Sequence, residues 1–309
     1  MPAGWIVKAL SGYYYVQPED ALDAHDSAEA AIQCRARGIF KKKGVTPLVG
    51  DRVLYEKTEN GEGTVDEILP RTSELIRPPV ANVNQAVLVF SATEPDLNLQ
   101  LLDKFLVHTE HAGLDTLIVL TKLDLLPDGE SAVVVDEMEL DRVRRLYESI
   151  GYPVIVTSSK SGFGLESVRA ALKDRISVFS GQSGVGKSSL LNAVVPGLSL
   201  ETNAISQRLG RGKHTTRHVE LFPLPGGGFV ADTPGFSQLD FVQLEPDELS
   251  GCFAEMRGYR AGCKFRGCLH QQEPGCLVQE AVEQGRIAPS RYRHYLTFLN
   301  EMKERKRRY

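Results

Sequence analysis

The sequence predicts a multi-domain chain with an N-terminal β-barrel, a central α/β domain of the P-loop class and a C-terminal metal-binding region with α-helices. Short strand-like segments fill residues 5–70, apolar strands alternate with helical periods from residue 84, and a glycine-rich loop follows one of those strands. Domains usually hold about 100 to 150 residues, so 309 residues are enough for more than one core. We place the domains at residues 1–74, 75–240 and 241–309.

The N-terminal region alternates strand-sized segments with turn residues. Strands are expected at residues 5–10, 13–16, 30–35, 51–56 and 63–68. Short strands at this spacing are typical of a small β-barrel. Basic and aromatic residues interleave between Cys34 and Lys43, a composition that suits a nucleic-acid backbone and equally suits a solvated basic face.

The central region changes to an alternation of strands and helices, which predicts a largely parallel sheet covered by helices. Strands are expected at residues 86–90, 116–121, 153–157, 176–180, 219–224 and 229–231. Two apolar stripes with helical spacing should face the core: Leu99, Leu102, Phe105, Leu106 and Thr109 in one helix, and Met138, Val143, Leu146, Tyr147 and Ile150 in the next. A last helix should turn Tyr292, Leu296 and Leu299 inward.

Composition is ordinary for a soluble globular protein. Apolar residues make up 42% and charged residues 25%, the apolar runs are strand-sized, and the start Met-Pro-Ala-Gly-Trp lacks signal-peptide features. We therefore expect no membrane segment, a cytoplasmic location and reduced thiols, so the five cysteines are better metal ligands than disulfides. Residues 251–309 carry 12 Lys and Arg against 6 Asp and Glu, a balance that could also suit a phosphate backbone.

A phosphate loop is the most specific motif. It consists of Gly181, Gln182, Ser183, Gly184, Val185, Gly186, Lys187 and Ser188, with Ser189 in the helix that follows. Its glycines let backbone N–H groups curl around a β-phosphate, and the helix N-terminus adds a favourable dipole. We expect Lys187 to reach the β- and γ-phosphates and Ser188 to coordinate Mg²⁺.

Two further segments complete a triphosphate and magnesium site. An Asp-Thr-Pro-Gly motif ends a strand, so Asp232 can approach Mg²⁺ through water and the Gly235 amide can face the γ-phosphate. Between this motif and the phosphate loop lies a glycine-rich loop, residues 210–216. We favour Thr216 over Thr215 as its Mg²⁺ ligand, and a plain surface loop is the alternative.

Two short motifs indicate that the base is guanine. Thr121, Lys122 and Asp124 follow one predicted strand, and Ser158, Ser159 and Lys160 follow another. Guanine presents two donors on one edge, and a fixed carboxylate such as Asp124 can accept from both, whereas adenine offers an acceptor there. Lys122 can lie along the base or ribose, the Ser159 amide can meet the guanine carbonyl, and Lys160 closes that loop.

Four residues have the spacing of a metal site. Cys263, Cys268, His270 and Cys276 supply three thiolates and one imidazole within 14 residues, the ligand set of a closed tetrahedral Zn²⁺ site. Since no position stays open, we expect one structural zinc per chain, ahead of free buried cysteines or a catalytic zinc. Cys34 and Cys252 fall outside this spacing and should lie in the cores. Removing the metal should unfold the local loop.

The order of the motifs is unusual. Ordinary small GTPases carry the phosphate loop first, whereas here the base motifs precede it, so the G domain is circularly permuted. The whole chain resembles the RsgA/YjeQ family of ribosome-small-subunit-dependent GTPases. The resemblance rests on this order of motifs, on residues 81–85 and 101–106, and on the cysteine loop. The resemblance implies an N-terminal OB-fold, a permuted GTPase domain and a C-terminal zinc domain.

The resemblance also implies partners and a role. The ligands would be GTP and GDP, the partners the 30S ribosomal subunit and its 16S rRNA, and the role a late step of 30S maturation. A ribosome assembly factor is a further candidate partner, and we expect a monomer. Thr121 stands where many GTPases have Asn, which predicts modest nucleotide affinity. Asn84 stands where relatives often have Asp, and Gly184 does not support a potassium site.

The catalytic residues that we predict are Lys187, Thr216 and His214. Position 236 is Phe, whereas small GTPases use a glutamine there to orient the attacking water, so intrinsic hydrolysis should be slow. We predict that His214 positions this water once its loop is ordered. The alternative is a histidine that contacts only rRNA or solvent.

The motifs favour a GTP-hydrolysing switch, and the family resemblance implies that the 30S subunit stimulates it. An RNA-binding checkpoint with incidental hydrolysis stays open, because only turnover separates the two. A metabolic P-loop kinase is disfavoured by Asp124 and by the lack of a substrate lid between the phosphate loop and Asp232.

Overall fold

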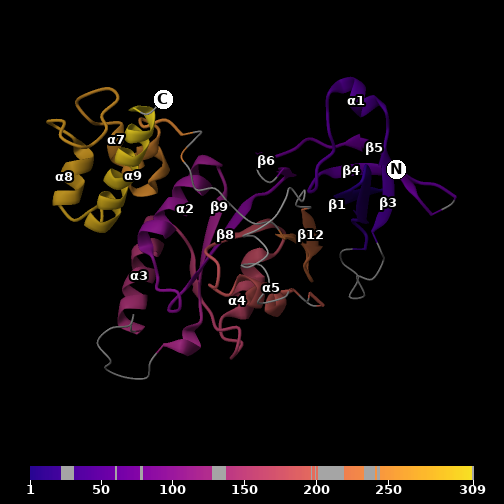
Figure 1. Ribbon diagram of the computed structural model, residues 1–309, viewed down its shortest axis with the longest axis horizontal. Helices are drawn as coiled ribbons and strands as arrows, with labels where there is room; N and C mark the ends of the chain where they lie inside the picture. The colour runs from indigo at the N-terminus through magenta and orange to yellow at the C-terminus, as the bar shows by residue number, and fades with distance from the viewer. Residues whose placement is uncertain are drawn as a thin grey trace.

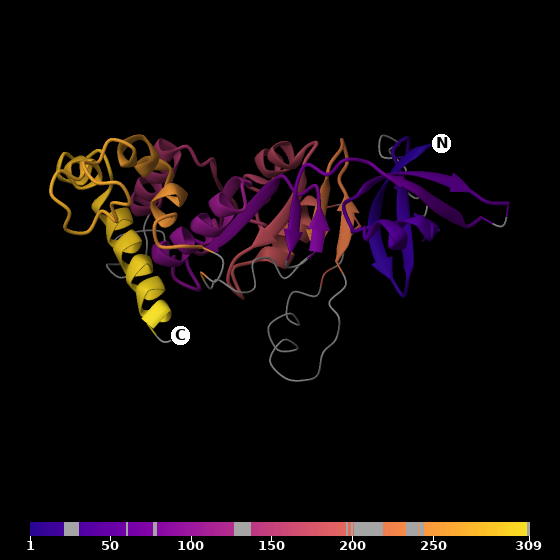
Figure 2. The same ribbon diagram turned by 90° about the horizontal axis from the view of Figure 1, so that it is seen from above.

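Three parts follow one another along the long axis of the molecule (Figure 1, Figure 2). The computed structural model describes residues 1–21, 31–59, 61–76, 79–126, 137–195, 197–198, 200, 219–232, 241 and 244–307. The N-terminal barrel lies at one end, the C-terminal helices lie at the other, and the α/β domain lies between them. The predicted multi-domain architecture is confirmed.

The barrel is built from five strands. They are β1 (Ala3–Leu10), β2 (Tyr13–Pro18), β3 (Ile32–Ala36), β4 (Arg52–Lys57) and β5 (Gly63–Ile68). Their order is β1-β2-β3-β5-β4, and the pairing of β1 with β4 closes the barrel around buried residues such as Ile6, Val16 and Val53. All five predicted strands are present, although β3 begins at Ile32, later than expected. The basic segment after β3 forms a short helix, α1 (Ile39–Lys43), which the sequence did not predict.

A short hairpin connects the barrel to the α/β domain. Its strands, β6 (Glu74–Ile76) and β7 (Pro79–Ala81), have 3 residues each, too few to give a periodic signal in the sequence. Asn82 anchors the connection, because its Nδ2 donates to the Gly50 carbonyl at 2.8 Å and its Oδ1 accepts from the Thr72 amide at 2.8 Å.

The α/β domain contributes strands in the order β10-β9-β8-β11-β13-β12. They are β8 (Gln85–Ser91), β9 (Asp115–Thr121), β10 (Val154–Val156), β11 (Ile176–Ser180), β12 (Glu220–Pro223) and β13 (Phe229–Asp232). Their pairings are parallel except for that of β12 with β13, in agreement with the predicted alternation. The helices are α2 (Leu99–His111), α3 (Glu137–Ile150), α4 (Leu165–Leu172) and α5 (Lys187–Val194).

The stripe predicted for α3 is wrong at one position. Met138 is 63% exposed, while Leu140, Val143 and Tyr147 are buried. With about 3.6 residues per turn, position 138 points roughly 140° away from position 143, so the two cannot share a face. The stripe predicted for α2 is confirmed, since Leu102, Phe105, Leu106 and Thr109 are buried and Leu99 is partly buried.

The barrel and the α/β domain share one sheet and one core. β12 pairs antiparallel with β1, and Lys8 lies opposite Glu220. Ile6 of the barrel belongs to the same buried cluster as Phe229 of β13. The ring centroids of Trp5 and Phe229 are 5.7 Å apart. The two domains are therefore packed against each other without a break.

The C-terminal part is helical. It contains η2 (Leu249–Cys252), η3 (Ala254–Met256), α7 (Arg257–Arg260), α8 (Leu277–Glu283) and α9 (Pro289–Arg307). The inner face of α9 is formed by Tyr295, Phe298, Leu299 and Met302, while Tyr292 and Leu296 are only partly buried. Cys34 and Cys252 are buried, as predicted. Among the described residues, no helix combines the length and apolar character needed to cross a membrane.

Candidate nucleotide and metal sites

The predicted phosphate loop lies between β11 and α5. The φ values of Gly181, Gly184 and Gly186 are 150°, 82° and 93°, and residues other than glycine rarely adopt such values. A Cβ atom at Gly181 would lie 2.0 Å from the Val89 carbonyl oxygen, so no side chain fits there. Since α5 begins at Lys187, its N-terminus opens toward the loop. This backbone can cradle phosphate groups.

Lys187 is held by the loop itself. Its Nζ donates to the carbonyl oxygens of Gly181 at 2.8 Å and Gln182 at 2.5 Å. Burial lowers the pKa of Lys187 to about 8. An entering phosphate would offer this side chain an anionic partner in place of two carbonyls. The remaining loop positions are buried Val185, exposed Ser183 and Gly184, and half-buried Ser188 and Ser189 in the first turn of α5.

The second base motif fixes the carboxylate of the first. Ser158 donates its hydroxyl to Oδ1 of Asp124 at 2.5 Å. Asp124 is exposed in the short helix η1 (Leu123–Leu125), which follows β9, and the buried Ser158 follows β10. Ser159 is half-buried and Lys160 is exposed in the same loop as Ser158. The hydrogen bond from Ser158 to Oδ1 therefore orients the Asp124 carboxylate, and Oδ2 can accept a hydrogen bond from a ligand.

Thr121 joins the first base motif to the phosphate loop. Its buried hydroxyl is within hydrogen-bond distance of the Val185 carbonyl and lies 3.2 Å from the Phe90 carbonyl. Lys122 has a φ of 61°, and its Nζ donates to the Glu94 carbonyl. Motifs that are far apart in the sequence thus meet where the parallel strands end, the usual ligand position in α/β sheets.

The rest of the predicted nucleotide site lies outside the described residues. This holds for His214, Thr215, Thr216, Gly235 and Phe236, and for the side chain of Asp232. The backbone of Asp232 ends β13 and pairs with Glu220 of β12. The roles assigned to these residues stay predictions.

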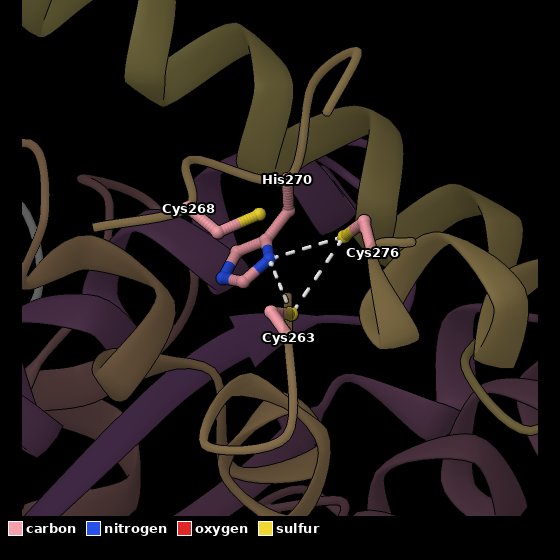
Figure 3. A group of neighbouring side chains, drawn as sticks. All are labelled: Cys263, Cys268, His270 and Cys276. Carbon is pink, nitrogen blue, oxygen red and sulfur yellow. Dashed lines mark hydrogen bonds between the residues drawn. The ribbon is translucent and has the colours of Figure 1, made fainter. Parts of the chain in front are cut away.

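The four predicted metal ligands converge in the C-terminal part (Figure 3). Nδ1 of His270 lies 3.6 Å from Sγ of Cys263 and 3.3 Å from Sγ of Cys276, and these two sulfurs are 4.0 Å apart. With Cys268 included, all four ligand atoms lie within 4.8 Å of one another. A tetrahedral Zn²⁺ with bonds of about 2.3 Å to sulfur and about 2.0 Å to nitrogen separates its ligands by about 3.5 to 3.8 Å. These residues therefore fit zinc, with Nδ1 as the imidazole ligand atom.

Comparisons with known proteins identify the family. A family model described as RsgA GTPase matches residues 68–242, and one described as RsgA N-terminal domain matches residues 3–65. The chain belongs to the RsgA GTPase family.

Several relatives are similar over their full length. The proteins named small ribosomal subunit biogenesis GTPase RsgA from Geobacillus kaustophilus and Halalkalibacterium halodurans are 55% and 54% identical, and the alignments cover 100% of each chain. The crystal structure of YloQ, a circularly permuted GTPase, has a TM-score of 0.81 and 46% identity, with 99% of this chain and 96% of that chain covered. YjeQ from Thermotoga maritima has a TM-score of 0.81 and 39% identity, with 97% and 98% covered. The predicted permutation is confirmed.

Glu273 lies among the four candidate metal ligands of this RsgA-family chain, in residues 263–276 (the candidate metal loop, or metal loop for short), and the sequence reasoning missed it. Its carboxylate accepts from the backbone amides of Leu269 at 2.8 Å, Gln271 at 2.7 Å and Gln272 at 3.1 Å. Burial by itself raises the pKa of Glu273, but backbone N–H groups outweigh it and lower the pKa to about 2. The sequence offered one signal for Glu273, because it is an acidic residue between the closely spaced candidate ligands His270 and Cys276.

Helix α9 supports the same loop from the other side. The hydroxyl of Tyr292 donates to the His270 carbonyl at 2.6 Å, and the hydroxyl of Tyr295 donates to the Leu269 carbonyl at 2.7 Å. His270 needs such support, because its φ of 56° is unfavourable for a residue with a side chain. Protein contacts therefore shape this RsgA-family loop together with any bound metal.

A buried charge cluster joins the RsgA GTPase domain to the C-terminal helices, and the sequence reasoning did not predict it. Asp103 of α2, which is 0% exposed, accepts from the Tyr147 hydroxyl at 2.7 Å and from Arg291 at 2.5 Å. Nδ1 of His294 lies 2.6 Å from its other oxygen. Arg291 also donates to both carboxylate oxygens of Glu255 at 2.7 and 2.9 Å. Charged side chains rarely reach a core, so periodicity alone would not reveal them.

Proposed function

We propose that this chain is a GTP hydrolase of small ribosomal subunit biogenesis. In the proposed cycle the GTP form binds the 30S subunit, contacts its 16S rRNA through the barrel and the C-terminal domain, hydrolyses GTP there and leaves with GDP. Family membership and the names of the relatives support this role. The observation that carries the GTPase part is the contact of Thr121 with the phosphate loop beside the Asp124–Ser158 pair.

In this proposal, nucleotide binding is divided between the two groups of motifs. Residues 181–189 cradle the phosphates, and Lys187 donates to the β- and γ-phosphates. Thr121, Lys122 and Asp124 bind guanine together with Ser158, Ser159 and Lys160. Since Asp124 is already oriented by Ser158, it loses little conformational freedom when guanine binds.

Hydrolysis is assigned to residues around the γ-phosphate. Bound Mg²⁺ would supply positive charge to the β- and γ-phosphates, with Ser188 and Thr216 as the side chains that hold it and Asp232 acting through water. The Gly235 amide donates to the γ-phosphate. His214 positions a water whose oxygen bonds to the γ-phosphorus as the bond to the bridging oxygen breaks, so that GDP and phosphate leave.

The remaining assignments concern the whole chain. We infer one structural Zn²⁺ on Cys263, Cys268, His270 and Cys276, supported by the geometry of the cluster. Domain boundaries at residues 74/75 and 240/241, a cytoplasmic location, a monomeric state and contact with a ribosome assembly factor complete the proposal.

GTP hydrolysis measured with and without purified 30S subunits tests the function. We expect a slow intrinsic rate, because Phe236 has no group that can orient water, and a faster rate with 30S subunits. An equal rate combined with nucleotide-dependent 30S binding would favour the checkpoint alternative. Loss of both responses would reject a ribosomal role. If His214→Ala matched the wild-type rate with 30S subunits, the role of His214 would be wrong.

A further inference from the structure

Three strands carry charged residues in one row between the barrel and the nucleotide domain. Lys8 of β1 lies opposite Glu220 of β12, and Glu220 lies opposite Asp232 of β13. The Nζ atom of Lys8 lies 3.1 Å from each carboxylate oxygen of Glu220. Lys8 is thus a barrel residue that forms an ion pair with Glu220, the cross-strand neighbour of Asp232, and Asp232 is the residue assigned to magnesium.

The register explains what the lysine does for this row. Residues directly opposite in an antiparallel pair are close neighbours, and like charges at such positions are destabilising. The backbones of Glu220 and Asp232 are opposite each other in the register, and both residues are acidic in the sequence. Lys8 supplies the cation that neutralises Glu220, so the end of β13 can keep its pairing with β12.

The barrel is attached firmly enough to hold Lys8 in place. Ile6 and Val7, which directly precede Lys8 in β1, are buried in one cluster with Leu221 and Phe229. Trp5 adds a ring contact to Phe229 at 5.7 Å. Because a packed core moves as a unit, β1, β12 and β13 should shift together when the barrel meets a partner.

We propose that Lys8 is a positioning residue for GTP hydrolysis, which holds Glu220 and thereby fixes the strand end at Asp232 from the N-terminal barrel. This inference rests on the proposed function, since it assumes that Asp232 acts near the metal. It adds a physical connection between the barrel and the reaction that none of the nucleotide motifs contains.

A double-mutant cycle tests the inference in the full-length chain. Lys8→Met should lower kcat about three- to fivefold, the upper part of the range that an exposed ion pair contributes. KM for GTP should stay the same, because the phosphate loop and Asp124 are untouched. Lys8→Arg should retain the wild-type kcat. In a Glu220→Gln background, Lys8→Met should have no further effect, because no charge is left to neutralise.

A matched control separates this role from general stability. Arg52 and Glu19 form an ion pair within the barrel, at 2.5 and 2.9 Å, so Arg52→Met removes the same charge without touching β12. We expect wild-type kcat for this variant and melting temperatures close to wild type for all of them. An unchanged kcat in Lys8→Met, or an equal loss in the Glu220→Gln background, would overturn the inference. A wild-type chain that hydrolyses no GTP under any condition would instead overturn the proposed function.

Discussion

The hydroxyl of Thr121 has a different role from the one that the sequence suggests. Compared with other GTPases, Thr in place of Asn predicts a lost contact to guanine. In the structure this hydroxyl reaches the carbonyls of Val185 and Phe90. The residue therefore links two loops, which the sequence could not show because the link depends on their positions in space.

This link gives a prediction for nucleotide affinity. Thr121→Val removes the hydroxyl with little change in shape, and a hydrogen bond contributes about 0.5 to 1.5 kcal/mol. We expect GDP and GTP to bind about three- to tenfold more weakly, as measured by fluorescence titration with a labelled nucleotide. Thr121→Ser retains the donor and should bind like wild type. Equal weakening in both variants would contradict the role of the hydroxyl.

Lys187 should make nucleotide binding depend on pH. Burial lowers its pKa to about 8 in the nucleotide-free protein. Below pH 8 the side chain is charged and binding is at full strength, whereas above pH 8 binding must first take up a proton, so affinity falls by up to about tenfold per pH unit. Titrations between pH 7 and pH 9 measure this effect. A constant affinity across that range would show that Lys187 stays charged without nucleotide.

At the scale of elements, the backbone of the metal loop accepts and donates more hydrogen bonds to side chains outside the ligand set than the sequence suggests. Cysteine and histidine spacing predicts the four ligands but says nothing of Glu273, Tyr292 or Tyr295, which bond the loop backbone from outside the ligand set. Periodicity had the opposite limitation in α3. It predicted a helix but assigned Met138 to the buried face, because an apolar residue was taken to be a core residue.

Glu273 should tune metal affinity without binding the metal. Glu273→Gln leaves one neutral acceptor for three amides, and residues that orient metal ligands typically change affinity about 10- to 100-fold. We expect a zinc affinity lower by that factor in competition with a chromogenic chelator. Glu283→Gln alters an exposed residue at the end of α8 and should bind zinc like wild type. Unchanged affinity in Glu273→Gln would mean that the metal alone shapes the loop.

At the scale of the molecule, the order of motifs predicted the permuted domain and the three parts, but not how the parts are joined. The junctions depend on contacts between distant segments: β1 with β12, and α2 with α9. The second junction buries Asp103 and Arg291 and largely covers Glu255, residue types that sequence patterns usually assign to the surface.

The charge cluster should contribute strongly to stability. Arg291→Met leaves two buried or nearly buried carboxylates, Asp103 and Glu255, without their shared cation. Breaking a buried ion pair by removing one partner costs about 3 to 5 kcal/mol. Urea denaturation should show this loss, while Arg293→Met, a change on the exposed face of the same helix, should stay within about 0.5 kcal/mol of wild type. A small effect of Arg291→Met would mean that the cluster is accessible to water.

The pairing of β1 with β12 also affects solubility. A strand at the border of a sheet offers unpaired N–H and C=O groups to any other chain, and this is a common start of aggregation. Here the barrel supplies the neighbouring strand, so the α/β domain has no bare border on that side. The barrel acts as a cap for the nucleotide domain, and a truncated chain without it should self-associate even though every nucleotide motif is still present.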